Sequence, residues 1–250
     1  MGQPMKSSAI PANDPTGPFE TGLSTQFEAP GTPADEGIVF CTDKDRLADI
    51  REPGTDLVIW QRTISPQLTD WLDHCDAVCL PHLRILVVPG DFRCAIEPLL
   101  DTNGLPRGNL RNRLVNDMGG LVSVYADITL CGLVDVRLES IDHDACWKFH
   151  RDNVEARLLT TYRGPATQWI QPPHAEQALR EQQEFDGPVE NLHLGDVAIF
   201  RGSSANPDEG IVHRSPRMAG TGASRLLLCL NRQSVTSPLP WNRQDQVESI

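Results

Sequence analysis

His150 and Asp152, in the segment FHRD, are the residues best suited to metal chemistry. They are two positions apart, so on an extended segment both side chains leave the same face, while Arg151 points the other way. A third ligand is offered by His213, in the segment IVHRSP. Two imidazoles and one carboxylate suit non-haem Fe(II), because they leave coordination positions open for other ligands. We therefore predict a mononuclear metal site at these three side chains.

A longer series of residues follows in a fixed order. The second half of the chain, roughly residues 133–232, resembles the Fe(II)/2-oxoglutarate-dependent oxygenases. In that family an H-x-D pair precedes a tyrosine, a G-x-x-T-x-W-like turn, a G-D-x-x-x-F strand, a distal histidine and a basic residue. The matching residues after the H-x-D pair are Tyr162, Gly164, Thr167, Trp169, Gly195, Asp196, Phe200, His213 and Arg225. The whole chain also resembles a bacterial family of unknown function that shares C-x-x-x-H-x-D and V-H-R-S-P segments.

The resemblance to the oxygenases implies a fold and a cosubstrate. The fold is mainly β with flanking helices, around a double-stranded β-helix of the jelly-roll or cupin-like type. The cosubstrate 2-oxoglutarate would chelate the iron, and its far carboxylate would pair with the guanidinium of Arg225. Tyr162 would add a hydroxyl donor. The alternatives are a surface arginine at a strand edge and a packed aromatic.

Four further residues lie close to the predicted ligands in the sequence. Cys146 would share a face with the ligand histidine on a strand, where a thiolate favours zinc; a buried apolar cysteine is the alternative. Asn153 would either orient the carboxylate or form a turn. Arg157 would contact substrate or pair with Glu155, and Arg214 would face substrate or solvent.

A second cluster combines ligand types in the segment HCDAVCLPH. Cys75 and Cys79 would share one helical face, between His74 and His82. Zinc is one interpretation, although the spacing differs from the common C-x-x-C arrangement. A helix face with core cysteines is the other.

These residues need a scaffold, and the sequence divides into four parts. Residues 1–36 are rich in proline and glycine, which predicts a disordered tail. One domain is expected over 37–238, with a mixed α/β support region at 37–131 and the metal-binding core at 132–232. The C-terminus, 239–250, is expected to be loose.

Hydrophobic patterning predicts the elements of this domain. We expect helices at 65–79, 107–130 and 174–185, and strands at 57–62, 83–88, 133–141, 154–162, 166–170, 189–194, 196–200 and 225–231. Ser65 is the expected N-cap of the first helix, with Pro66 at its first position. Many short strands separated by turn residues indicate an antiparallel sandwich or barrel.

Composition limits the partners. A net charge of −12 and a pI near 4.9 argue against binding to nucleic acid or an anionic membrane, and the basic run at 107–113 is interpreted as a solvated helix start. The sequence lacks a secretory signal and a membrane-spanning stretch, so a cytoplasmic protein is expected.

The first functional hypothesis is a hydroxylase that acts on an unknown small molecule or protein. The alternative is a non-catalytic jelly-roll protein that binds zinc or iron for metal handling. A metal-free binding module is the third hypothesis.

Overall fold

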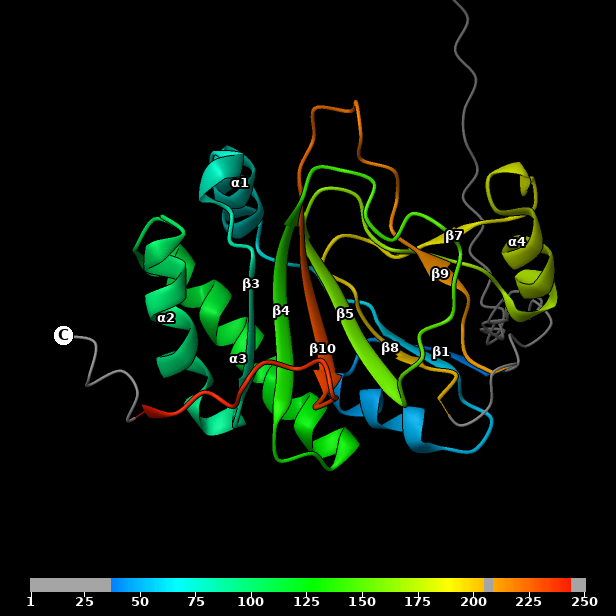
Figure 1. Ribbon diagram of the computed structural model, residues 1–250, viewed down its shortest axis with the longest axis horizontal. Helices are drawn as coiled ribbons and strands as arrows, with labels where there is room; N and C mark the ends of the chain where they lie inside the picture. The colour runs from blue at the N-terminus through cyan, green and yellow to red at the C-terminus, as the bar shows by residue number, and fades with distance from the viewer. Residues whose placement is uncertain (1–36, 205–208, 244–250) are drawn as a thin grey trace, which may run out of the picture. The chain divides into compact units, whose positions relative to one another are not determined.

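The computed structural model describes residues 37–204 and 209–243, which all belong to one unit, Asp35–Ile250. The predicted N-terminal tail lies outside the described residues, as do residues 244–250 of the predicted C-terminal segment. The described chain is mostly sheet with flanking helices, as expected (Figure 1).

Two sheets form the centre of this unit. The strands are β1 (Ile38–Cys41), β2 (Leu57–Trp60), β3 (Leu83–Val87), β4 (Val134–Ile141), β5 (Ala156–Arg163), β6 (Gln168–Trp169), β7 (Glu190–Asn191), β8 (Val197–Arg201), β9 (His213–Arg214) and β10 (Arg225–Arg232). The large sheet has seven strands in the order β1-β2-β8-β5-β10-β4-β3. It is mixed, because β1 and β2 are parallel whereas the other neighbours run antiparallel. The small sheet has the order β7-β6-β9.

The helices lie mainly along one side of the large sheet. They are α1 (Pro66–His74), α2 (Phe92–Thr102), α3 (Asn109–Thr129) and α4 (Ala175–Glu181), with 3-10 helices at Lys44–Arg51, Ala77–Cys79, Pro89–Asp91, Pro172–His174 and Gln182–Glu184. In Figure 1, α1 to α3 lie beside β3 and β4, whereas α4 lies beyond the small sheet. Helix α1 begins as predicted, with the Ser65 side chain accepting a hydrogen bond from the Leu68 N–H at 3.3 Å.

Helix α2 was not predicted from the sequence. Pro98 lies inside it, where it removes one backbone donor and ordinarily disfavours a helix. Packing compensates, because the helix buries Phe92, Ala95, Ile96 and Leu100 on a single stripe.

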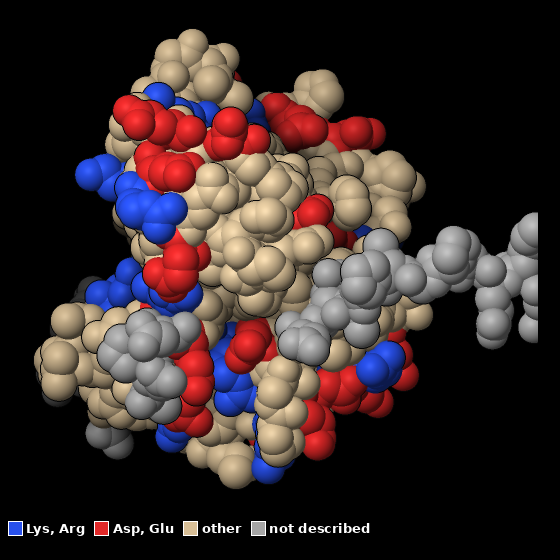
Figure 2. All heavy atoms as spheres, turned by 90° about the vertical axis from the view of Figure 1, so that its right-hand side faces the viewer, with Lys and Arg blue, Asp and Glu red and all other residues tan. Residues whose placement is uncertain are grey.

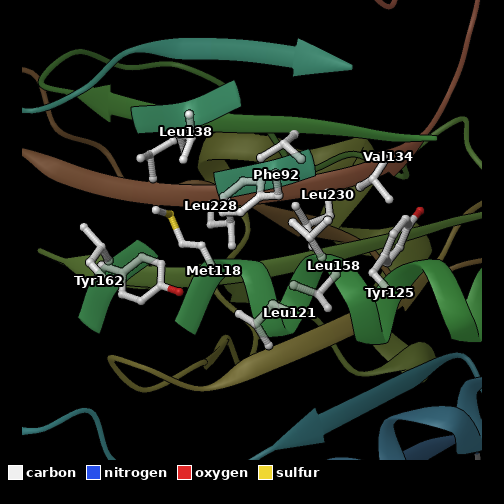
Figure 3. Packing of buried hydrophobic residues seen from close by; sticks show 14 of the residues in the cluster. Phe92, Met118, Leu121, Tyr125, Val134, Leu138, Leu158, Tyr162, Leu228 and Leu230 are labelled. Carbon is white, nitrogen blue, oxygen red and sulfur yellow. The ribbon is translucent and has the colours of Figure 1, made fainter. Parts of the chain in front are cut away.

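The large sheet separates two apolar layers, because alternate residues of each strand face opposite sides. On the helix side, Leu158 and Tyr162 of β5 pack with Met118 and Tyr125 of α3 (Figure 3). On the other side, Leu159 of β5 and its neighbours pack against the small sheet. Strands β1, β2 and β3, which belong to the predicted support region, extend the same large sheet.

Residues 240 and 241, at the start of the predicted C-terminal segment, follow the edge strand β3. Pro240 forms a bridge with Leu86, and the Trp241 N–H donates to the Leu86 carbonyl at 2.7 Å. Trp241 also packs against the helix-side core. These contacts cover an otherwise open sheet edge, which is a common way to block unwanted strand pairing.

Charged side chains of both signs occur on the face shown in Figure 2, where they lie mainly around a central area of uncharged residues. Within the predicted basic run, Arg107 and Arg111 both bind Asp101. Among the described residues, no helix is long and apolar enough to cross a bilayer.

A partly buried ion pair joins α3 to the sheet. Arg62 donates to both carboxylate oxygens of Asp117, at 2.5 and 2.9 Å, and Tyr162 donates its hydroxyl to the same carboxylate at 2.5 Å. The Arg62 side chain is only 12% exposed. Losing its partner would therefore leave a charge with little access to water.

We predict that Asp117→Ala lowers the free energy of unfolding by about 3 kcal/mol, because it strands the Arg62 guanidinium. Urea denaturation measures this change. Asp73→Ala is the matched control: Asp73 is 59% exposed and lies 3.8 Å from Arg163, so a change within about 0.5 kcal/mol is expected. Equal effects of the two substitutions would contradict the prediction.

Candidate metal centre

The structure brings His150, Asp152 and His213 together. Their ligand atoms all lie within 4.8 Å of one another, and within residues 37–204 and 209–243 no other group of three such side chains is this close. The His213 Nε2 lies 3.2 Å from Asp152 Oδ2, and the His150 Nε2 lies 3.6 Å from Asp152 Oδ1. Metal–ligand bonds of about 2.1 Å at right angles separate neighbouring ligand atoms by about 3 Å, so the two contacts with Asp152 are already close to the separation that one ion requires.

Backbone pairing positions the two imidazoles. The His150 N–H donates to the His213 carbonyl and the His213 N–H donates to the His150 carbonyl, both at 3.0 Å. This antiparallel bridge adds the His150 segment to the small sheet beside β9, whose other neighbour is β6. Directly paired residues project side chains from the same face, and the two ring centroids lie 4.7 Å apart.

Each imidazole is held through its Nδ1, which leaves its Nε2 available to bind a metal. The Nδ1 of His150 lies 2.8 Å from the Lys148 carbonyl, and the Nδ1 of His213 lies 3.0 Å from the Ile211 carbonyl. A carbonyl only accepts, so each Nδ1 carries a hydrogen, and in the neutral ring Nε2 keeps its lone pair. Both Nε2 atoms face the carboxylate. A carbonyl that orients a histidine in this way is typical of metal ligands.

Asp152 is buried and held through its backbone. Its carbonyl accepts hydrogen bonds from the N–H and the hydroxyl of Ser203, at 2.8 and 3.1 Å. Its side-chain Oδ2 is buried and receives no hydrogen bond, although it lies beside His213 Nε2. Two buried lone pairs this close repel each other unless a proton or a cation lies between them. The donor set therefore fits a divalent metal ion.

The charges of the group favour the ionised carboxylate. Burial by itself would raise the pKa of Asp152, but its contacts with His150 and His213 and the nearby Arg157 guanidinium outweigh burial and lower the pKa. Burial would lower the pKa of His150, and the interaction with Asp152 instead raises it. Asp152 is thus the anionic ligand that the sequence predicts.

Arg225 lies deep in the same region and is fully buried. Its guanidinium donates to three hydroxyls: Ser215 at 2.7 Å, Thr167 at 2.6 Å and Thr161 at 3.3 Å. Its Nε has no hydrogen-bond partner, and among the described residues no carboxylate pairs with it. Burial lowers the pKa of Arg225 to about 10, so the side chain remains charged at neutral pH. The negative charge of Glu139 raises the pKa of Arg225, but by less than burial lowers it.

Tyr162 does not lie where the sequence-based interpretation needs it. Its position on β5 has the opposite parity from Arg157 and Thr161, so its ring enters the helix-side core (Figure 3). Its hydroxyl binds Asp117 of α3 instead. The expected contact between Tyr162 and a cosubstrate is therefore incompatible with this structure, and Thr161 presents a hydroxyl to Arg225 in its place.

The weaker candidates also differ from expectation in part. Cys146 is exposed on a loop with a φ of 50°, and is neither a strand residue nor buried. Asn153 is exposed at a bend, consistent with its interpretation as a turn residue. Arg157 donates to Asp152, whereas Glu155 pairs with Arg232. Arg214 stacks on the Phe149 ring, with its Cζ 3.9 Å from the ring centroid.

The second cluster of cysteines and histidines does not assemble. Helix α1 ends at His74, so Cys75 and Cys79 do not share the face of one α-helix. The imidazoles of His74 and His82 each lie against a backbone carbonyl, of Asp70 and Ser140 respectively. These four residues are not among the close groups of metal-binding side chains in the described chain.

A cavity of about 90 Å³ opens beside the two histidines. Strands β4, β5 and β10 of the large sheet line one wall, and the segments around His150 and His213 line the other. Thr167 and Ser215, which hold Arg225, also line it. The cavity thus reaches from the metal-binding side chains to the hydroxyl partners of the buried arginine.

Comparison with known proteins places the chain in a family. The family model described as "Protein of unknown function (DUF1826)" matches residues 41–231, which include every residue of this site. The chain belongs to the DUF1826 family. No curated protein matches it significantly. Membership confirms the expected likeness to a family of unknown function, and it assigns no activity to the DUF1826 site.

Three residues that shape the DUF1826 site were missed from the sequence: Thr161 and Ser215, which hold Arg225, and Asn231, which holds Arg157. Thr167 was matched as a motif residue, but its hydrogen bond with Arg225 was not foreseen. Strand parity is the signal that could have found the β5 and β10 residues, because odd-numbered positions of both strands share the site-facing side. Thr167 and Ser215 lie in loops, where no periodic pattern points to them.

Gly202 is a further residue whose role becomes clear only in the structure. A Cβ at this position would lie 2.0 Å from the Val154 carbonyl oxygen and 2.7 Å from the Asp152 carbonyl oxygen. The chain after β8 therefore passes directly against the segment that carries the carboxylate ligand. A side chain there must displace Asp152 or the strand end.

We predict that Gly202→Ala weakens Zn(II) binding by this DUF1826 protein on the order of tenfold or more, because it shifts Asp152. Competition with a chromophoric chelator measures the affinity. Gly132→Ala is the matched control, since a Cβ at Gly132 meets nothing within 4 Å and should leave the affinity unchanged. Undiminished Zn(II) affinity in the folded Gly202 variant would contradict the prediction.

Proposed function

We propose that the protein is an Fe(II)/2-oxoglutarate-dependent oxygenase that hydroxylates a substrate. The observation that carries the proposal is the pairing of two features in one cavity. A cluster of two histidines and one aspartate with open Nε2 atoms lies at one end. A fully buried arginine without a carboxylate partner among the described residues lies behind Thr167 and Ser215, whose hydroxyls line the same cavity.

The strand order supports a jelly-roll core for this function. From β4 onward the chain passes repeatedly from one sheet to the other. The large sheet receives β4, β5, β8 and β10. The small sheet receives the His150 bridge between β4 and β5, then β6 and β7 between β5 and β8, and β9 between β8 and β10. Each sheet thus receives four segments, in the orders β8-β5-β10-β4 and β7-β6-β9 with the His150 bridge. Eight segments wound in this way are what a jelly roll requires.

The three ligands suit Fe(II) in particular. Two imidazoles and a carboxylate on one side of an ion are the donors of non-haem iron oxygenases, and they leave positions for exogenous ligands. When bound at such a site, Fe(II) with 2-oxoglutarate and oxygen supplies hydroxylation of a C–H bond, while 2-oxoglutarate is converted to succinate and CO₂. Zinc fits the same side chains, and it is the metal of the alternative function in metal handling.

Arg225 supplies the recognition of an anion. A buried cation without a counter-charge is unfavourable, and a carboxylate bound at the guanidinium would relieve it. The hydroxyls of Thr161, Thr167 and Ser215 accept hydrogen bonds from Arg225, so their own hydrogens must point elsewhere. Those hydrogens can be donated to the same carboxylate. The arginine and its three hydroxyl partners thus form a dicarboxylate anchor on the wall of the metal cavity.

We predict that anaerobic addition of Fe(II) and then 2-oxoglutarate produces the visible charge-transfer band of a 2-oxoglutarate–iron chelate. Arg225→Met should keep Fe(II) binding but weaken the apparent affinity for 2-oxoglutarate on the order of 100-fold, because it removes the cation that pairs with the far carboxylate. Titration of the band with Fe(II) measures metal binding, and titration with 2-oxoglutarate measures the apparent affinity for the cosubstrate.

Tyr162→Phe is the control for this experiment, because Tyr162 lies on the opposite face of the sheet and should not change the titration. Iron that binds without producing the band would reject the cosubstrate. An Arg225→Met protein that titrates like the parent would reject Arg225 as the anchor of the far carboxylate.

A further inference from the structure

Arg157 lies on the site-facing side of β5, next to the metal-binding cluster. In the sheet it is the register partner of Asn231 on β10 and of Phe200 on β8. Its side chain is 21% exposed and lines the cavity. It is therefore a charged group built into the floor of the site and not a surface residue.

The guanidinium is fixed at both ends. Its Nη1 donates to Oδ1 of Asp152, and its Nε donates to the side-chain carbonyl of Asn231 at 2.8 Å. Asn231 is 5% exposed, and its amide nitrogen lies 3.3 Å from the Cys229 sulfur. Only one orientation of the Asn231 side-chain amide directs its oxygen toward Arg157 and its nitrogen toward Cys229. Arg157 cannot turn away from Asp152 without leaving the buried Asn231 oxygen unpaired.

The two carboxylate oxygens of Asp152 consequently differ. Oδ1 accepts the hydrogen bond from Arg157, whereas Oδ2 is buried, receives no hydrogen bond and lies 3.2 Å from His213 Nε2. An acidic side chain can bind a metal through one oxygen or both. Here one of the two oxygens is already engaged by a positively charged donor.

We propose that Arg157 is a positioning residue that restricts Asp152 to one-oxygen coordination, through Oδ2. The protein then supplies three ligand atoms to a six-coordinate ion and leaves three positions for exogenous ligands. This inference rests on the metal site of the proposed function but not on the identity of the cosubstrate.

The test uses Co(II), whose visible absorption reports coordination number and geometry. Arg157→Met keeps the length of the side chain but removes the donor and the charge. We expect its visible bands to shift, because both carboxylate oxygens become available to the ion. We expect its Co(II) affinity to fall roughly 10- to 100-fold, because Asp152 loses the side chain that orients it. Arg157→Lys retains a donor and a charge and should recover part of the affinity and most of the parent spectrum.

Two further variants separate positioning from general effects. Arg214→Met removes another arginine that lines the cavity but does not contact a metal-binding side chain, so its Co(II) affinity and spectrum should match the parent. Asn231→Leu leaves Arg157 in place but removes its anchor, and it should shift the spectrum in the direction of Arg157→Met. Far-ultraviolet circular dichroism establishes that each variant is folded.

A folded Arg157→Met protein with the Co(II) affinity and spectrum of the parent would overturn the inference. So would a shift of equal size in Arg214→Met, because the effect would then come from the charge of the cavity in general. Failure of the oxygenase proposal looks different: the 2-oxoglutarate–iron band would be missing while the Co(II) spectrum still depended on Arg157.

Discussion

Two backbone hydrogen bonds between His150 and His213 determine the geometry on which the site depends. They join segments that are far apart in the sequence into one antiparallel pair, and that pairing places both imidazoles on one face. The Nδ1 atoms then meet the carbonyls two residues earlier in the chain, which directs both Nε2 atoms toward Asp152. Without this bridge the ligands would be two unrelated loop residues.

The large sheet serves two purposes, and strand alternation keeps them separate. Even-numbered residues of β5 and β10, such as Leu158 and Leu228, build the core under the helices. Odd-numbered residues, such as Arg157 and Arg225, face the small sheet, where polar groups and the cavity lie. The helix-side core is therefore kept apart from the polar groups of the site, although apolar residues such as Leu159 also pack on the site-facing side.

The same alternation explains how far the sequence could be interpreted. His150, Asp152 and His213 could be proposed because their residue types are uncommon together and the first two share a local spacing. Most strands and helix α3 followed from hydrophobic periodicity. Tyr162 was assigned to the site because it lies within the motif. Its even-numbered position on β5, which places it on the helix side of the sheet, was given too little weight.

Other features depend on contacts between distant segments, which a single sequence does not reveal. Helix α2 forms around Pro98 because its apolar stripe packs on the sheet. Cys146 was assigned to a strand, but the chain leaves the extended conformation there, with a φ of 50°. The partner of Arg157 depends on how the loop before β5 folds back, and sequence proximity pointed to Glu155 instead of Asp152.

The two arginines of the site, Arg157 and Arg225, differ in one respect that bears on any function. Arg157 is paired with Asp152, so its charge is compensated within the protein. Arg225 is surrounded by hydroxyls, and burial lowers its pKa to about 10 without removing its charge at neutral pH. A protein that only held a metal would gain nothing from this second cation, whose burial is unfavourable. An anionic ligand that spans the cavity compensates the charge, and a neutral ligand does not. Arg225 is therefore the residue on which the proposed binding of an anionic cosubstrate depends most directly.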